Sequence, residues 1–130
     1  MSTDLNEITR MTIAGAIAVH HELGPGLLEQ AYEACLTFEL LSQGLKIERQ
    51  KTLPIVYKGQ HLNCGYRIDL LVEELVIVEI KSVERLERVH SAQLLSYLRF
   101  ARCQVGLLFN FNVKWLVQDG VKRVVNGFKE

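Results

Sequence analysis

The 130-residue chain has little of what marks several classes of protein. It has only two prolines and nine glycines, and its 15 basic side chains are matched by 15 acidic ones, so the formal net charge is zero. With 48% apolar residues, this composition is typical of a folded globular protein rather than a fibrous or disordered one. The length matches one ordinary domain, and we expect a single domain over residues 1–130.

Other absences in the sequence restrict the cellular location and the functional class of the protein. Zero net charge argues against a protein that coats nucleic acid by bulk electrostatics. No apolar run is long enough to cross a membrane, and residues 1–10 carry charges where a signal peptide has its apolar core. Cys35, Cys64 and Cys103 are isolated, without CxxC spacing, which favours buried thiols over disulfides or a zinc site. We therefore expect a cytoplasmic protein without membrane contact.

Two helices are predicted at the start of the chain. Apolar side chains recur at intervals of three and four over residues 5–23, and the Gly-Pro-Gly sequence at residues 24–26 ends that helix. Residues 28–41 repeat the helical spacing, and Gly44 is a natural terminator. The chain therefore opens with a helical pair.

The period then changes to the alternation of β-strands. Residues 46–57 alternate and are rich in β-branched side chains, and the Lys-Gly pair at residues 58–59 indicates a turn. Residues 61–72 are then the returning strand of a predicted hairpin. After a second turn at residues 73–74, the apolar run at residues 75–80 is typical of a central strand covered on both faces.

The last third of the chain predicts one more helix and more strands. Helical spacing returns over residues 88–102, residues 104–111 form an apolar strand, and residues 114–118 and 121–125 resemble a closing hairpin around an Asp-Gly turn. The predicted order is α, α, β, β, β, α, β, β, β. We expect an α/β fold in which helices flank a mixed β-sheet.

Charged residues interrupt two of the apolar strands. Glu79 and Lys81 lie in the central strand and, because side chains alternate along a strand, they point to the same face. An ion pair at the end of a strand is the structural alternative. Burying either charge is nevertheless costly unless it is paired or binds a metal.

Asp69 is likewise a charged residue among apolar neighbours, one strand earlier in the chain. If the two strands pair across the turn at residues 73–74, Asp69 and Glu79 lie roughly opposite each other. Two neighbouring carboxylates repel and raise each other's pKa, and a divalent cation relieves this repulsion by binding both. The spacing therefore predicts a metal site.

These residues carry a family resemblance. Asp69 with Glu79-Ile80-Lys81 resembles the acid, acid-x-Lys core of the PD-(D/E)xK nucleases. The whole chain resembles the family named for its GxxExxxR motif, usually placed in that superfamily. The segments that carry this resemblance are Val19-His20, Leu23-Gly24-Pro25-Gly26-Leu27-Leu28-Glu29, Tyr57-Lys58-Gly59, Ile68-Asp69-Leu70-Leu71-Val72, Gln93-Leu94-Leu95-Ser96-Tyr97-Leu98-Arg99 and Gly106-Leu107-Leu108-Phe109-Asn110-Phe111.

The resemblance implies a restriction-endonuclease-like fold and a Mg²⁺ or Mn²⁺ site. The ligands that it implies are Glu29, Asp69, Glu79 and the backbone carbonyl of Ile80. In such a site Lys81 orients or deprotonates the attacking water and offsets the charge that builds on the phosphate. Gln93 is implied to help fix the site. Glu29 also has a structural reading, since the helix dipole favours an acid in a first turn.

One position departs from the family pattern. Glu33 stands where the family name places an arginine, which puts the role of that arginine in doubt and adds negative charge near the site.

The leading hypothesis for function is a metal-dependent nuclease that acts on DNA or RNA, with DNA favoured. A homodimer remains open, because small nucleases often dimerise to cut two strands. The alternative is a catalytically inactive nuclease fold used for nucleic-acid binding or interaction, which zero net charge and Glu33 support. A structural or regulatory subunit is a third reading, and it predicts no metal affinity.

Overall fold

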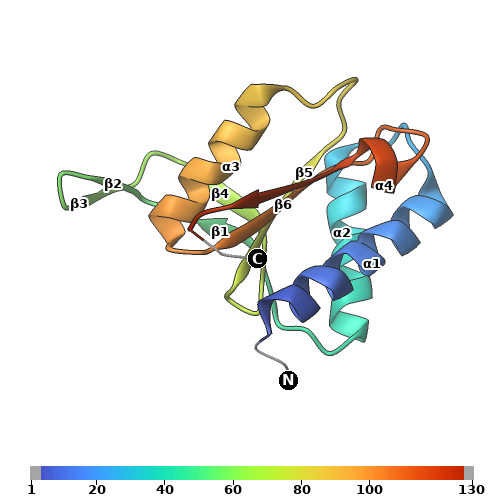
Figure 1. The fold of residues 1–130 in the computed structure, drawn as a ribbon, viewed down its shortest axis with the longest axis horizontal. Helices are drawn as coiled ribbons and strands as arrows, with labels where there is room; N and C mark the ends of the chain where they lie inside the picture. Colours follow the sequence, from blue (N-terminus) through green and yellow to red (C-terminus); the bar gives the residue numbers. More distant parts are fainter. Residues whose placement is uncertain (1–3, 128–130) are drawn as a thin grey trace.

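A computed structural model of the protein describes residues 4–127, which form a five-stranded mixed sheet flanked by helices (Figure 1). In chain order the elements are α1 (Leu5–Leu23), α2 (Glu29–Ser42), β1 (Ile47–Thr52), β2 (Ile55–Tyr57), β3 (Gln60–Leu62), β4 (Arg67–Val72), β5 (Val76–Lys81), α3 (Arg88–Ala101), β6 (Val105–Asn110), α4 (Leu116–Asp119) and β7 (Val121–Val125). The predicted α/β fold with a mixed sheet is confirmed.

The order of strands puts the predicted central strand in the middle. The main sheet runs β1-β4-β5-β6-β7, with β5 and β6 parallel and the other neighbours antiparallel. A parallel pair needs a crossover connection, and α3 lies in the connection between β5 and β6. Glu79 and Lys81 therefore lie on a strand that has a neighbour on each side.

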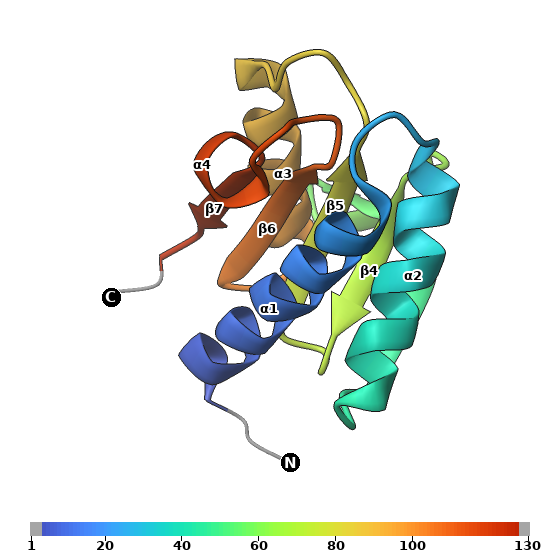
Figure 2. The ribbon, with the colours of Figure 1, turned by 90° about the vertical axis from the view of Figure 1, so that its right-hand side faces the viewer.

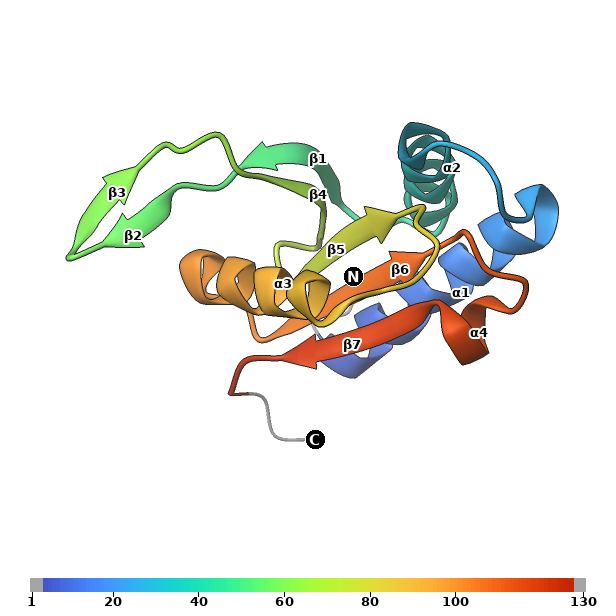
Figure 3. The same ribbon diagram turned by 90° about the horizontal axis from the view of Figure 1, so that it is seen from above.

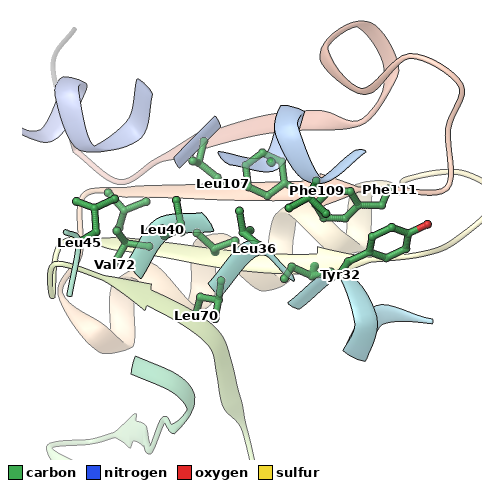
Figure 4. Close-up of a cluster of buried hydrophobic side chains, with 14 of the residues drawn as sticks. Tyr32, Leu36, Leu40, Leu45, Leu70, Val72, Leu107, Phe109 and Phe111 are labelled. Atoms are coloured by element: carbon green, nitrogen blue, oxygen red, sulfur yellow. The ribbon is translucent and has the colours of Figure 1, made fainter. Parts of the chain in front are cut away.

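Helices cover both faces of the sheet, with α1 and α2 on one face and α3 on the other (Figure 2). Side chains of α2 pack on the sheet in the larger core cluster (Figure 4). Successive residues of β5 alternate between the two cores: Val78 and Ile80 belong to the α1–α2 side, and Ile77 belongs to the α3 side. By this alternation the side chain of Glu79 points to the same face of the sheet as that of Ile77.

The predicted hairpin over residues 46–72 forms in two sections. The section near the ends of the hairpin is the β1–β4 pair, which belongs to the main sheet. The section near the turn is a separate two-stranded sheet of β2 and β3. Leu53 and Pro54 interrupt the first strand, because proline has no N–H to donate and Leu53 is buried in the α3-side core. Beyond this break the hairpin continues as β2 and β3, which are not part of the main sheet.

The predicted strand at residues 114–118 is wrong. The short helix α4 occupies this segment, Leu116 is buried in the core, and Gly120 ends the helix by donating its N–H to the Leu116 carbonyl at 2.7 Å. Gly120 also passes close to β6, where an added Cβ would lie 2.4 Å from the Asn110 carbonyl oxygen. The strand at 121–125 does form, but it pairs with β6.

The cysteines only partly match the expectation. All three are free, Cys103 is buried, Cys35 is partly buried, and Cys64 is exposed after β3, so the expectation of buried thiols is wrong for Cys64. Within residues 4–127 no helix is both long and apolar enough to cross a membrane.

Candidate functional site

Asp69 and Glu79 face each other where the β4–β5 ladder ends. The last paired residues are Leu70 and Val78, and the next position brings the two acids together. The Asp69 N–H donates to Glu79 Oε2 at 2.9 Å, and the Ile80 N–H donates to Asp69 Oδ2 at 2.8 Å. Each carboxylate thus accepts a backbone donor of the opposite strand, and the predicted opposition of residues 69 and 79 is confirmed.

The surroundings of the pair disfavour two negative charges. Glu79 is only 5% exposed, and its pKa rises to about 8, first because burial removes water from the carboxylate and next because Asp69 is negatively charged. Burial likewise raises the pKa of Asp69, and the charge of Glu33 adds to this. A cation that binds both carboxylates would relieve this cost.

Lys81 supplies a positive charge to the same region. It is partly buried at the end of β5, two residues after Glu79, and its charge lowers the pKa of both Asp69 and Glu79, although less than burial raises them. Among residues 4–127 it has no ion-pair partner within 4.0 Å. Its ammonium group therefore remains available to a ligand.

Glu29 is held at the carboxyl end of β5. It is the first residue of α2, and its Oε2 accepts the N–H of Ser82, the residue after β5, at 3.0 Å. Ser82 Oγ donates to the Leu27 carbonyl at 2.6 Å, which fastens the preceding loop to the same point. Tyr32 adds a third restraint, because its hydroxyl donates to the Gly24 carbonyl at 2.6 Å.

A cleft of about 480 Å³ brings Glu29 and Asp69 to a common surface. Its lining residues are Glu29, Gln30, Glu33, Arg49, Gln50 and Asp69. The cleft thus carries three acids, a guanidinium and two amides between α2 and β1. Such a set suits a hydrated cation better than an apolar ligand.

Glu33 reaches this cleft already paired. It is 8% exposed, and its Oε2 accepts from Arg49 at 3.0 and 3.2 Å. Gln50 Nε2 donates to Glu33 Oε1 at 2.6 Å and to Asp69 Oδ1 at 3.3 Å, so one amide joins the two acids. The predicted repulsion from Glu33 is present as a contribution that raises the pKa of Asp69 and Glu79, and Arg49 supplies a counter-charge.

Gln50 reaches both acids from an unusual backbone conformation. Its φ is +49°, in the left-handed region, although it lies inside β1. Its neighbours Arg49 and Lys51 keep the regular register with β4. This conformation costs of order 1 kcal/mol for a residue other than glycine. A strained residue beside a cleft is a reason to assign it a role in positioning the acids.

The complete ligand set implied by the resemblance does not come together. Residues 4–127 contain no group of three His, Cys, Asp or Glu side chains placed to hold one metal ion. For Ile80 the described contact is its N–H bond to Asp69, and Gln93, partly buried on α3, makes no hydrogen bond to Lys81. The metal-binding roles of Glu29 and Ile80 and the role of Gln93 therefore stay predictions.

The comparison with families of known proteins agrees with this arrangement. A family model described as PD-(D/E)XK nuclease superfamily matches residues 6–124, nearly the whole chain. The chain belongs to the PD-(D/E)XK nuclease superfamily. No curated protein and no solved structure matches it significantly.

Membership in this superfamily agrees with the fold. The five-stranded mixed sheet flanked by helices is consistent with a restriction-endonuclease-like fold. Asp69 with Glu79-Ile80-Lys81 resembles the acid and acid-x-Lys pattern in the superfamily name. In this PD-(D/E)XK chain Asp69 lines the cleft beside α2, whereas Glu79 is buried.

Several site residues were missed by the sequence reasoning. Tyr97, interpreted as core, is buried, but the charges of Glu79 and Asp69 contribute, after burial, to raising its pKa to about 12, so it lies near the acids. Asn110 is 1% exposed and exchanges two hydrogen bonds of 3.0 Å with the Val83 backbone, which fixes the segment after Lys81. A buried polar residue at a strand end was the available signal for Asn110.

Arg49→Ala should lower the free energy of unfolding by about 1 kcal/mol, because it leaves Glu33 without a charged partner. Half of the Arg49 side chain is exposed, which keeps the expected loss this small. Urea denaturation at pH 7 measures it. Adding Glu33→Gln should restore most of the stability, and a double variant that loses the sum of the two single losses would contradict the coupling.

Proposed function

We propose that the protein is a metal-dependent nuclease that hydrolyses phosphodiester bonds of DNA. One observation carries the proposal: two carboxylates from neighbouring strands converge, and one of them, Glu79, is buried, which together raise the pKa of Glu79 to about 8. Structural acids are usually paired with cations, whereas this pair has only the partial influence of Lys81. Perturbed carboxylates in a nuclease superfamily indicate a functional site.

The side chains fit a hard divalent cation. Asp69 and Glu79 offer oxygen atoms that already repel one another, which is the donor chemistry that Mg²⁺ and Mn²⁺ prefer. We assign the cation to these two acids, with Glu29 and the carbonyl of Ile80 as further ligands. When bound, it would polarise the phosphoryl oxygen and lower the pKa of a water.

The chain's own residues would perform the remaining steps. Lys81, free of an ion pair within residues 4–127, orients the attacking water and offsets the negative charge that develops on the phosphate. Gln50 keeps Asp69 in place through the Glu33–Gln50–Asp69 contacts. Gln93, one helical turn before Tyr97, is assigned a supporting role.

Binding without cleavage is the second candidate function. The lack of a three-ligand group within residues 4–127 favours it, because a nuclease fold that serves for binding or interaction needs no complete metal site.

The proposal has three narrower parts. We propose that the protein belongs to the GxxExxxR family and that it forms a homodimer to cut two strands. We also propose a cytoplasmic location, which the three free cysteines support.

Lys81→Ala should lower the rate of Mg²⁺-dependent cleavage by about 10² to 10³-fold, because it removes the only side chain assigned to offset phosphate charge. The assay incubates the protein with plasmid, single-stranded DNA and RNA in Mg²⁺, Mn²⁺ or EDTA. Lys122→Ala, an exposed lysine of β7, is the matched control and should cleave as the native protein does.

The outcomes separate the two candidates. Cleavage that requires a divalent cation and falls in the Lys81 variant alone supports the nuclease. Native protein that binds nucleic acid in EDTA and never cuts it would favour the binding fold. Full cleavage by Lys81→Ala would overturn the assignment of that lysine.

A further inference from the structure

The β2–β3 ribbon extends from the edge of the molecule. We define the arm as residues 53–66, which comprise β2, β3 and their connections to β1 and β4. Figures 1 and 3 show the arm reaching past the end of α3, away from α1 and α2. Its tip is a two-residue turn in which Lys58 and Gly59 have φ of +50° and +77°, the tight hairpin geometry that keeps the two strands paired.

The arm packs against the rest of the protein at its base, and its two strands are exposed to solvent. At the base Leu53 is buried and donates its N–H to the Tyr66 carbonyl at 2.9 Å, and Tyr66 meets Tyr97 of α3 edge-on at 5.8 Å. Above the base, five of the six strand residues are exposed and the sixth is partly buried. An isolated two-stranded ribbon is marginally stable, so a ribbon with both faces exposed is suited to contact a partner.

Charge identifies the kind of partner. Residues 49–68 contain four basic side chains and no acidic one, in a chain whose net charge is zero. Arg49 and Lys51 are paired with acids outside this segment, whereas Lys58 and Arg67 form no ion pair within residues 4–127. Lys58 at the tip of the arm and Arg67 just beyond its base, at the start of β4, are therefore uncompensated cations. They favour a polyanion, because phosphate contacts dominate nucleic-acid affinity.

The arm also has a direct geometric relation to the acid pair. Its second half runs into β4, the strand that carries Asp69, and Arg67 lies two residues before this acid. Lys58 lies eleven residues before Asp69. At about 3.3 Å per extended residue, its reach is at most about 36 Å. This is close to one turn of duplex DNA, about 34 to 36 Å.

We propose that the arm lies in the major groove of duplex DNA beside the acid pair, with Lys58 and Arg67 on phosphates of the groove walls. This rests on the proposed function, because the duplex is the substrate assigned to that pair. The major groove of B-form DNA admits a two-stranded ribbon, whereas the deep, narrow major groove of A-form RNA does not. Tyr57 and His61 are exposed on the same ribbon and supply additional polar and ring contacts to the backbone.

The test measures binding without cutting. In an Asp69→Asn background without divalent metal, fluorescence anisotropy follows a labelled DNA duplex longer than two helical turns over a series of salt concentrations. Lys58→Glu with Arg67→Glu should weaken binding by about tenfold or more and reduce the slope of log K against log salt by about two. Lys114→Glu with Lys122→Glu makes the same charge change at two exposed sites elsewhere, and its affinity should stay within about twofold.

Four other outcomes would overturn the arm's role, and a fifth would keep it. Equal weakening by both pairs of substitutions would mean a general charge effect, and equal affinity for duplex RNA would remove the groove argument. A parent protein that does not bind duplex DNA, or a dimer that the arm substitutions convert to monomers, would also contradict it. DNA binding through the arm by a native protein that never cuts would keep this inference and reject the nuclease.

Discussion

Asp69→Asn should lower Mg²⁺-dependent cleavage by about 10³-fold, the scale of losing a principal electrostatic stabiliser of the transition state. The substitution removes one of the two charges assigned to hold the cation. It keeps an oxygen that can still accept the Ile80 N–H, which donates to Asp69 Oδ2 at 2.8 Å. The loss should therefore reflect chemistry rather than unfolding, and initial rates of plasmid cleavage measure it.

The matched control for this prediction is Asp119→Asn, an exposed acid of α4 far along the chain from the pair. It should retain native activity. In metal-free buffer Asp69→Asn should unfold at a urea concentration equal to or above that of the native protein, because it removes repulsion from Glu79. Cleavage by Asp69→Asn at the native rate would reject the acid pair as the reaction centre.

The metal-free protein should lose about 2 to 4 kcal/mol of stability between pH 5 and pH 8.5. Folding raises the pKa of Glu79 from an ordinary 4.5 to about 8, so in this range the folded state holds a proton that the unfolded state has released. The unfolded state binds fewer protons, and stability therefore falls as pH rises. The raised pKa of Asp69 acts in the same direction.

Urea denaturation in EDTA at pH 5 and pH 8.5 measures this slope. Glu79→Gln should flatten it, because an amide stays neutral throughout the range. Adding Mg²⁺ at pH 8.5 should return stability to the native protein, by about 2.7 kcal/mol at a hundredfold excess over its dissociation constant. Stability that is level or rises with pH in the metal-free native protein would contradict the desolvated acid pair.

The acid pair could be predicted from sequence because its signals are local. Alternation in an apolar strand put Glu79 and Lys81 on one face, and the length of the β4–β5 turn put Asp69 opposite Glu79. The hairpin over residues 46–72 was predicted for the same reason. Each rests on period and turn chemistry, which a short stretch of chain determines.

The network around the pair could not be predicted, because tertiary contacts create it. Gln50 contributes through a positive φ that nothing in its β-strand sequence indicates, and Arg49 meets Glu33 only after β1 docks beside α2. Ser82 meets Glu29 across 53 positions of the sequence. Long-range pairs of this kind have no periodic pattern to reveal them.

The wrong strand at residues 114–118 has a similar cause. Trp115 and Val117 favour a strand by their intrinsic preference, but burial of Leu116 and the close passage of Gly120 against β6 select a helical turn. Tertiary packing thus overrides a weak local preference. The same limit applies to Tyr97, whose nearness to the acids depends on how α3 lies on the sheet.

Direct binding of a divalent cation is the most direct test of a metal site at Asp69 and Glu79. Mn²⁺ titrated into the protein at pH 8 can be followed by the electron paramagnetic resonance signal of the free ion, without any substrate. We predict saturable binding to the native protein, at least about tenfold weaker binding to Glu79→Gln, and native affinity in the exposed control Asp119→Asn. Equal Mn²⁺ affinity in the native protein and Glu79→Gln, or no binding by either, would contradict a metal site at Asp69 and Glu79.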